Sequence, residues 1–162
     1  MIFRYIAIGG LFATAIWLGR GYSAFVDRRI GEMRGFSAMI LHMEGEISRT
    51  LGFGPSLFRS FSDEFLEKSG LLPSLRQGIS LEDAFFECRG RLALTKEMKD
   101  MLSSLFSSFG GGYMEEEISR LREARGQIEL ALGSECECLE KNKRVVNALL
   151  FGAAASGAII LM

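Results

Sequence analysis

The chain has few of the residues that catalytic and metal sites depend on. Its 162 residues include one histidine, His42, and three cysteines, Cys88, Cys136 and Cys138. Three cysteines give no disulfide framework, and a single histidine without a partner motif is more often a packing or surface residue than a ligand. No serine–histidine–aspartate set or supported cysteine–histidine pair is present. We therefore expect no enzyme, no metal and no cofactor.

Prolines and strand patterns are also scarce. Pro55 and Pro73 are the two prolines, and both fall at predicted segment boundaries. No stretch shows sustained period-two alternation of β-branched residues, so a sheet has no support. The net charge is −1, with no basic block beyond two short flanks, and nothing indicates a nucleic-acid partner. The sequence predicts an all-α protein.

Both ends of the chain lack charge. Residues 145–162 contain no charged side chain, and residues 5–19 form a second uncharged run between Arg4 and Arg20. About 20 apolar residues cross a hydrocarbon core of about 30 Å. A buried core helix remains an alternative for the second run, and a secretory signal peptide for the first, although the A-x-A-like cleavage pattern is poorly matched. We predict an N-terminal transmembrane anchor at 1–20, a helical domain at 21–144 and a C-terminal transmembrane helix at 145–162.

Basic residues predict the orientation of these spans. Arg4 is the only charged residue outside the stretch from Arg20 to Arg144, and positive charge stays on the cytoplasmic side of a membrane. We therefore expect a two-pass cell-membrane protein whose central domain is cytoplasmic. Small residues four apart in both runs suit close helix pairing in lipid. These are Gly9 with Ala13, Gly10 with Thr14, Gly152 with Ser156 and Ala153 with Gly157.

Apolar spacing and capping residues predict two long helices and several short ones. The long helices continue into the two uncharged runs and pair antiparallel, so the expected architecture is a membrane-anchored antiparallel helical bundle. A Phe-rich helix 55–69 lying on the membrane surface is a weaker alternative, because its polar face is acidic. The predicted segments are a helix from the first run to Leu51, a helix over 55–69, a turn region over 70–78, a helix from Ser80 to Arg89, a helix from Thr95 to Phe109, a break at 110–112, and a helix from Tyr113 onward.

Glu44 is the most informative polar residue, because it falls on the apolar seam of the first long helix. A buried carboxylate is costly unless it is paired, and Arg120, Arg122 or Arg125 of the returning helix could pair with it. Contact with another protein is the alternative. Two other patterns have structural explanations. Residues 115–117 are three glutamates at a helix start, where carboxylates complement the helix dipole. Cys136 and Cys138 point about 200° apart on a helix, which disfavours a shared metal ion.

Four short motifs, together with the order of the segments, resemble one protein family. The first long helix carries Leu41-His42-Met43-Glu44-Gly45-Glu46-Ile47, which resembles that family's leucine-rich stretch before Glu-x-Glu-Ile. The others are Pro55-Ser56-Leu57, Phe106-Ser107-Ser108-Phe109-Gly110, and Asn142-Lys143-Arg144 before the apolar tail ending Leu161-Met162. In these respects the chain resembles stage III sporulation protein AB of endospore-forming bacteria.

The resemblance implies a function. That family's domain is similar to the cytoplasmic domain of the inner-membrane platform protein of type II secretion systems and type IV pili. It implies a non-enzymatic component of a channel between mother cell and forespore, in the mother-cell membrane, with a secretion-type ATPase, other channel membrane proteins and the lipid bilayer as partners. The small residues of the two uncharged runs also allow self-association, and the sequence leaves open whether the domain is a monomer or a dimer. Glu44, Glu46, Phe109 and Gly110 are the implied partner-binding or registry residues.

Two other function classes remain as alternatives. A membrane-anchored dimeric adaptor or signalling hairpin would have longer and cleaner heptads than this interrupted seam. A membrane enzyme would need His42, Glu44 and Glu46 to converge in one cavity. On one helix His42 and Glu46 share a face while Glu44 points away, so the spacing disfavours that site.

Overall fold

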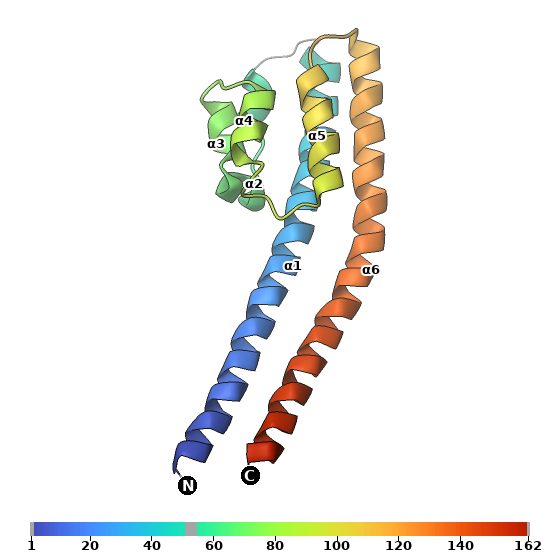
Figure 1. Cartoon of the computed structure of the whole chain (residues 1–162). Coiled ribbons are helices and arrows are strands. Elements are labelled where there is room, and N and C mark those ends of the chain that lie inside the picture. Colours follow the sequence, from blue (N-terminus) through green and yellow to red (C-terminus); the bar gives the residue numbers. More distant parts are fainter. Residues whose placement is uncertain (1, 51–54, 162) are drawn as a thin grey trace. The chain divides into compact units, whose positions relative to one another are not determined.

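The computed structural model describes the backbone of residues 2–50 and 55–161, and its regular structure there is entirely helical (Figure 1). The all-α prediction is confirmed. In chain order the elements are α1 (Ile2–Thr50), the 3-10 helix η1 (Pro55–Phe58), α2 (Glu64–Ser69), α3 (Leu71–Arg76), α4 (Leu81–Cys88), α5 (Lys96–Ser108) and α6 (Met114–Leu161).

The chain divides into two compact units. The central unit comprises Arg28–Gly133, and the terminal unit comprises the residues up to Asp27 together with those from Ser134 onward. Helices α1 and α6 contribute to both units. The first long helix was expected to run unbroken from the first uncharged run, and the last to run unbroken into the second; both expectations are confirmed.

The core of the central unit lies between the two long helices and the short ones. Helices α2, α3 and α4 pack successively on one another, and α4 packs on α5. Phe36 of α1 meets Phe85 of α4 edge-to-face at 6.0 Å between ring centroids, and Phe85 meets Phe106 of α5 at 5.2 Å. Aromatic pairs at such separations add to the free energy gained by burying the rings. Leu121, Ala124 and Ile128 of α6 complete this core.

The caps of α4 and α5 form as their sequences predict. Ser80 Oγ accepts the N–H of Asp83 at the start of α4, and Thr95 Oγ1 accepts the N–H of Met98 at the start of α5. Each hydroxyl satisfies a backbone donor that has no partner within its helix. Gly110 has φ 88°, a left-handed conformation that glycine adopts without steric cost, so α5 ends before the predicted break.

Two predictions between residues 55 and 78 are wrong. The expected helix 55–69 is interrupted, because Asp63 is extended (φ −146°, ψ 129°) and its carboxylate caps α2 by accepting the N–H groups of Phe65 and Leu66. The expected turn region 70–78 contains α3, which buries Leu71, Leu72 and Leu75 between two positive-φ glycines. The Phe-rich surface helix therefore does not exist as one element. Residues 51–54, where α1 was expected to end, lie outside the described part.

The terminal unit is an antiparallel pair of helical segments. Lys143 Nζ of α6 lies 3.1 Å from Asp27 Oδ1 of α1. A Cβ placed on Gly19 would lie 2.7 Å from Asn147 Oδ1, so α1 and α6 approach closely at this level. Val26 and Ala15 are buried in the pair.

No helical stretch within the described part of the chain is both long enough and apolar enough to cross a bilayer. Met1, Met162 and the side chains of several other residues in both end segments lie outside the described set. The spans predicted at 1–20 and 145–162 stay predictions.

Candidate functional site

Glu44 faces the returning helix, as its place on the seam predicts. Its side chain is 11 % exposed, with Arg122 Nε at 3.9 Å and Arg125 Nη1 at 4.0 Å. Arg120, the third candidate partner, instead lies 3.7 Å from Glu117. The two contacts to Glu44 are long, and Glu44 Oε1 accepts no hydrogen bond among the described atoms. At these distances the charges of Glu44 and the two arginines favour one alignment of α1 with α6, but they do not form a tight ion pair.

His42 and Glu46 share a face of α1, as expected, but they have separate neighbours. His42 Nε2 lies 2.9 Å from the carbonyl oxygen of Leu57 and 3.3 Å from Ser60 Oγ, and its ring stacks on Phe61 at 5.4 Å. Glu46 Oε1 lies 3.0 Å from Arg49 Nη1. Since a carbonyl can only accept, His42 Nε2 carries the proton and ties η1 to α1. His42 therefore has a packing role.

Phe109 and Gly110 lie at the end of α5, next to the start of α6. Phe109 is half-buried against the core, and Gly110 is exposed. Of the three glutamates that follow, Glu117 is 1 % exposed, and its Oε1 accepts the N–H of Gly112 at 3.1 Å. Glu117 therefore holds the glycine turn against the first turn of α6, as the helix-start interpretation predicts. Whether Phe109 and Gly110 also meet a partner stays a prediction.

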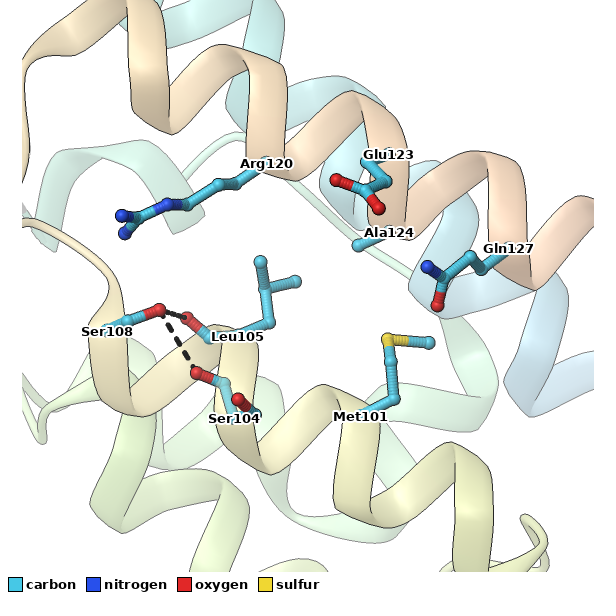
Figure 2. A pocket seen from close by; sticks show the side chains of 8 residues that line it. All are labelled: Met101, Ser104, Leu105, Ser108, Arg120, Glu123, Ala124 and Gln127. Carbon is cyan, nitrogen blue, oxygen red and sulfur yellow. Dashed lines mark hydrogen bonds between the residues drawn. The ribbon is translucent and has the colours of Figure 1, made fainter.

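A groove of about 330 Å³ lies between α5 and α6, and Figure 2 shows its lining. Met101 and Leu105 of α5 and Ala124 of α6 form the apolar floor. Glu123 and Gln127 extend over it and make no ion pair or hydrogen bond with other described residues. Ser108 Oγ is already bonded to the carbonyl oxygens of Ser104 and Leu105. The α5/α6 groove thus combines an apolar floor with polar groups that are free to bind.

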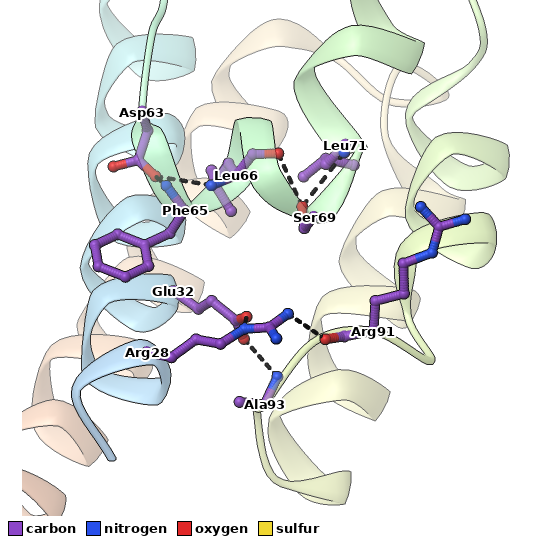
Figure 3. Close-up of polar contacts among 9 residues, drawn as sticks. All are labelled: Arg28, Glu32, Asp63, Phe65, Leu66, Ser69, Leu71, Arg91 and Ala93. Atoms are coloured by element: carbon purple, nitrogen blue, oxygen red, sulfur yellow. Dashed lines mark hydrogen bonds and ion pairs between the residues drawn. The ribbon is translucent and has the colours of Figure 1, made fainter. Parts of the chain in front are cut away.

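A buried polar cluster centred on Glu32 was missed in the sequence (Figure 3). Glu32 is fully buried; its Oε1 lies 2.8 Å from Arg28 Nε, and its Oε2 accepts the N–H of Ala93 at 2.6 Å. Arg28 also donates to the carbonyl oxygen of Arg91. The cluster therefore fastens the segment between α4 and α5 to α1. The i, i+4 spacing of Arg28 and Glu32 beside Met33 was the available signal.

The cysteines form no metal site within the described residues. Cys88 is buried on α4, and desolvation raises the pKa of its thiol to about 11. Cys136 is half-buried and Cys138 is exposed on α6. Neither belongs to a described group of metal-ligating side chains.

Residues 4–162 match the family model of stage III sporulation protein AB. The chain belongs to this family. The match includes the central unit and nearly all of both end segments, so the resemblance found in the short motifs is confirmed. Family membership assigns the protein a role in sporulation. No curated protein and no solved structure matches the chain significantly.

Proposed function

We propose that this stage III sporulation protein AB is a non-enzymatic platform component of a secretion-like channel between mother cell and forespore. The observation that carries the proposal is the extent of the family match, which takes in both end segments as well as the central unit. Two features support it. The two end segments pair antiparallel in one terminal unit, and α1 and α6 continue into that unit without a break. Both ends of the chain can then attach the protein at one place.

We infer that the attachment is to the cell membrane, with the central unit in the cytoplasm. Two uncharged runs flanked by basic residues support this orientation. The expected result in sporulating cells is that the full chain sediments with membranes, resists extraction by carbonate at high pH and is released by detergent. Release by carbonate alone would show a peripheral protein and overturn the two-pass anchoring.

A secretion-type ATPase is the proposed cytoplasmic partner, and the α5/α6 groove is the surface that suits it best. Glu44 already faces two arginines of its own chain, whereas Glu123 and Gln127 are exposed beside the apolar floor. Peptide grooves generally combine an apolar floor with a few polar groups that fix orientation. Phe109 and Gly110 follow directly after Ser108, at one end of this groove.

In-cell photo-crosslinking tests this partner. A photoreactive phenylalanine analogue is placed at Ser104 or Gln127 in the groove, at Glu46 on α1, and at Phe86 on the exposed side of α4 as the matched control. We expect an ATPase band from the groove positions, lost when the ATPase is deleted, and none from Phe86. A band from Glu46 alone would move the docking surface to α1. No ATPase band at any position would refute ATPase docking.

A further inference from the structure

A second groove lies on the outer side of α1 and α6, and nothing in the proposed ATPase contact uses it. It encloses about 330 Å³ between Ala38 and Leu41 of α1 and Ile128 and Leu132 of α6, with Arg34 and Glu129 at its rim. Leu41 is 53 % exposed although it is a large aliphatic residue. Exposed apolar surface between two helices commonly marks an interface.

The rim charges are arranged for a self-complementary contact. Glu129 lies on the α6 wall with its side chain 57 % exposed and its Oε1 3.5 Å from Arg125 Nε of its own chain, whereas Arg34 lies on the α1 wall with no partner among the described residues. Ser37 Oγ donates to Glu129 Oε1, which places residue 37 level with residue 129. Arg34 is then one helical turn away, about 4.5 Å along the axis at 1.5 Å per residue. That offset is within the reach of an arginine side chain.

We propose that this α1/α6 groove is a homodimer interface in which a second copy binds about a two-fold axis parallel to the two helices. In such an isologous pair α1 of one copy faces α6 of the other at the same level. Arg34 of each copy then meets Glu129 of the other, while Leu41 packs into the other copy's hollow. Ala38 lies level with Ile128, and its small side chain allows the backbones of the two copies to approach each other.

The direction of the axis follows from the proposed membrane anchoring, on which this inference rests. A parallel axis keeps α1 and α6 pointing the same way in both copies, as two copies in one membrane require. The α5/α6 groove is the surface proposed for the ATPase, which leaves the α1/α6 groove for self-association.

The test uses the purified full chain in detergent, with the mass of the particle measured by light scattering across a dilution series. We expect a dimer. Arg34→Glu and Glu129→Arg should each raise the dimer dissociation constant about tenfold, because each change disrupts two symmetry-related ion pairs and opposes like charges. The double variant Arg34→Glu with Glu129→Arg should return the constant to within about threefold of the original.

Matched variants separate this interface from general instability. Leu41→Arg should give monomers, whereas Phe86→Arg, on the exposed side of α4, should leave the dimer intact; circular dichroism confirms helicity in both. Proximity is checked by mixing a chain carrying only Arg34→Cys with a tagged chain carrying only Glu129→Cys, both free of native cysteines. A short bismaleimide should join the two chains, and it should not join chains carrying Ser104→Cys.

Three results would overturn the dimer: a monomeric wild-type chain, no rescue in the double variant, or a dimer that persists in Leu41→Arg. In-cell crosslinks from Leu41 that reach only other proteins would assign the groove to a different partner. Because the measurement needs neither the ATPase nor a cell membrane, its failure leaves the carbonate-extraction and ATPase results unaffected. Loss of anchoring with the dimer retained would refute the proposed function and remove the argument for a parallel axis, but it would leave the dimer itself standing.

Discussion

Glu32 and Glu44 are both carboxylates on the core side of α1, but only one is fully bonded. Glu32 has an arginine Nε at 2.8 Å and a backbone N–H at 2.6 Å, whereas the nearest cations to Glu44 lie at 3.9 and 4.0 Å. Removing a bonded, buried acceptor leaves its donors without partners, which costs more than losing a distant charge. We therefore expect the side chain of Glu32 to contribute more to the free energy of unfolding than that of Glu44.

Alanine substitution measures that difference. We expect Glu32→Ala to lower the free energy of unfolding by about 2–3 kcal/mol, because the N–H of Ala93 loses its acceptor. Glu44→Ala should lower it by about 1 kcal/mol or less. Urea unfolding of the full chain, followed by circular dichroism, measures both. Equal losses would show that Glu44 is bonded more tightly in solution.

Cys88 should be the least reactive thiol of the chain. Its side chain is buried, and with a pKa of about 11 the thiolate is rare at neutral pH. We expect a maleimide to modify the exposed Cys138 readily and to reach Cys88 only when the protein is unfolded. Mass spectrometry of timed samples, with a urea-treated control, gives the rates. Rapid modification of Cys88 in the native protein would contradict its burial.

Glu67 should make stability depend on pH in the acid range. Hydrogen bonds from Arg76 and then Ser62 lower the pKa of its carboxyl below the ordinary 4.5. Because the folded state has the lower pKa, the stabilisation is complete above 4.5 and is lost as the pH falls through the folded value. Glu67→Gln should flatten thermal stability against pH below 4.5. Glu123→Gln, which removes a carboxyl that has no hydrogen-bond partner among the described residues, is the matched control.

At the scale of the element, the sequence predicts helices well where caps and periodicity agree. Ser80 and Thr95 cap helices whose apolar positions recur at helical spacing, and both helices form as expected. The helix 55–69 fails because Phe58, Phe61 and Phe65 fit a helical face, yet Asp63 between them is a strong N-cap. Asp63 binds two N–H groups of α2, and local capping overrides the periodic pattern.

Helix α1 has two buried stripes, and the predicted seam follows only one of them. The predicted positions Val26, Met33, Ile40, Glu44 and Ile47 are buried, while Ile30 and Ser37 are half-buried, and Leu51 lies outside the described residues. A second stripe at steps of four, three and four is also buried, because α1 is covered by short helices as well as by α6. It consists of Glu32, Phe36, Met39 and Met43. Tracing one seam therefore missed Glu32.

Two glycines inside α1 have different surroundings, so replacing each of them with alanine should have opposite effects on stability. A Cβ on Gly35 would lie 2.7 Å from Asp63 Oδ1, which caps α2 and cannot move without losing its bonds, whereas one on Gly45 would meet nothing within 4 Å. We expect Gly35→Ala to lower the free energy of unfolding by about 1–2 kcal/mol, through the loss of the cap. Gly45→Ala should raise it by about 0.5–1 kcal/mol, because alanine favours the helix.

Thermal and urea unfolding of the two glycine variants provide the comparison. Their difference in sign is the informative result, because both sites lie in the interior of the same helix. Stabilisation by Gly35→Ala would mean that α2 does not pack closely on α1. Destabilisation by Gly45→Ala would mean that an exposed surface of α1 is covered by something beyond this chain.

At the scale of the whole molecule, two long helices link the units. Each of α1 and α6 is unbroken across a boundary between the units, at Asp27–Arg28 and Gly133–Ser134. Arg20 lies between the first boundary and the first uncharged run, and Lys141, Lys143 and Arg144 lie between the second boundary and the second run. The predicted orientation follows from these charges and from the uncharged runs beyond them, none of which involves tertiary packing.

The protein's own cysteines can test that orientation. Cys136 and Cys138 precede the second uncharged run, on its basic side, so they should face the cytoplasm. We expect a membrane-impermeant maleimide to leave Cys138 unmodified in intact protoplasts and to modify it after permeabilisation, with Cys88 silent in both. An Arg4→Cys variant lacking Cys136 and Cys138 should be modified in intact protoplasts, because Arg4 precedes the first uncharged run. Modification of Cys138 without permeabilisation would reverse the topology and place the central unit, with both grooves, beyond the reach of any cytoplasmic ATPase.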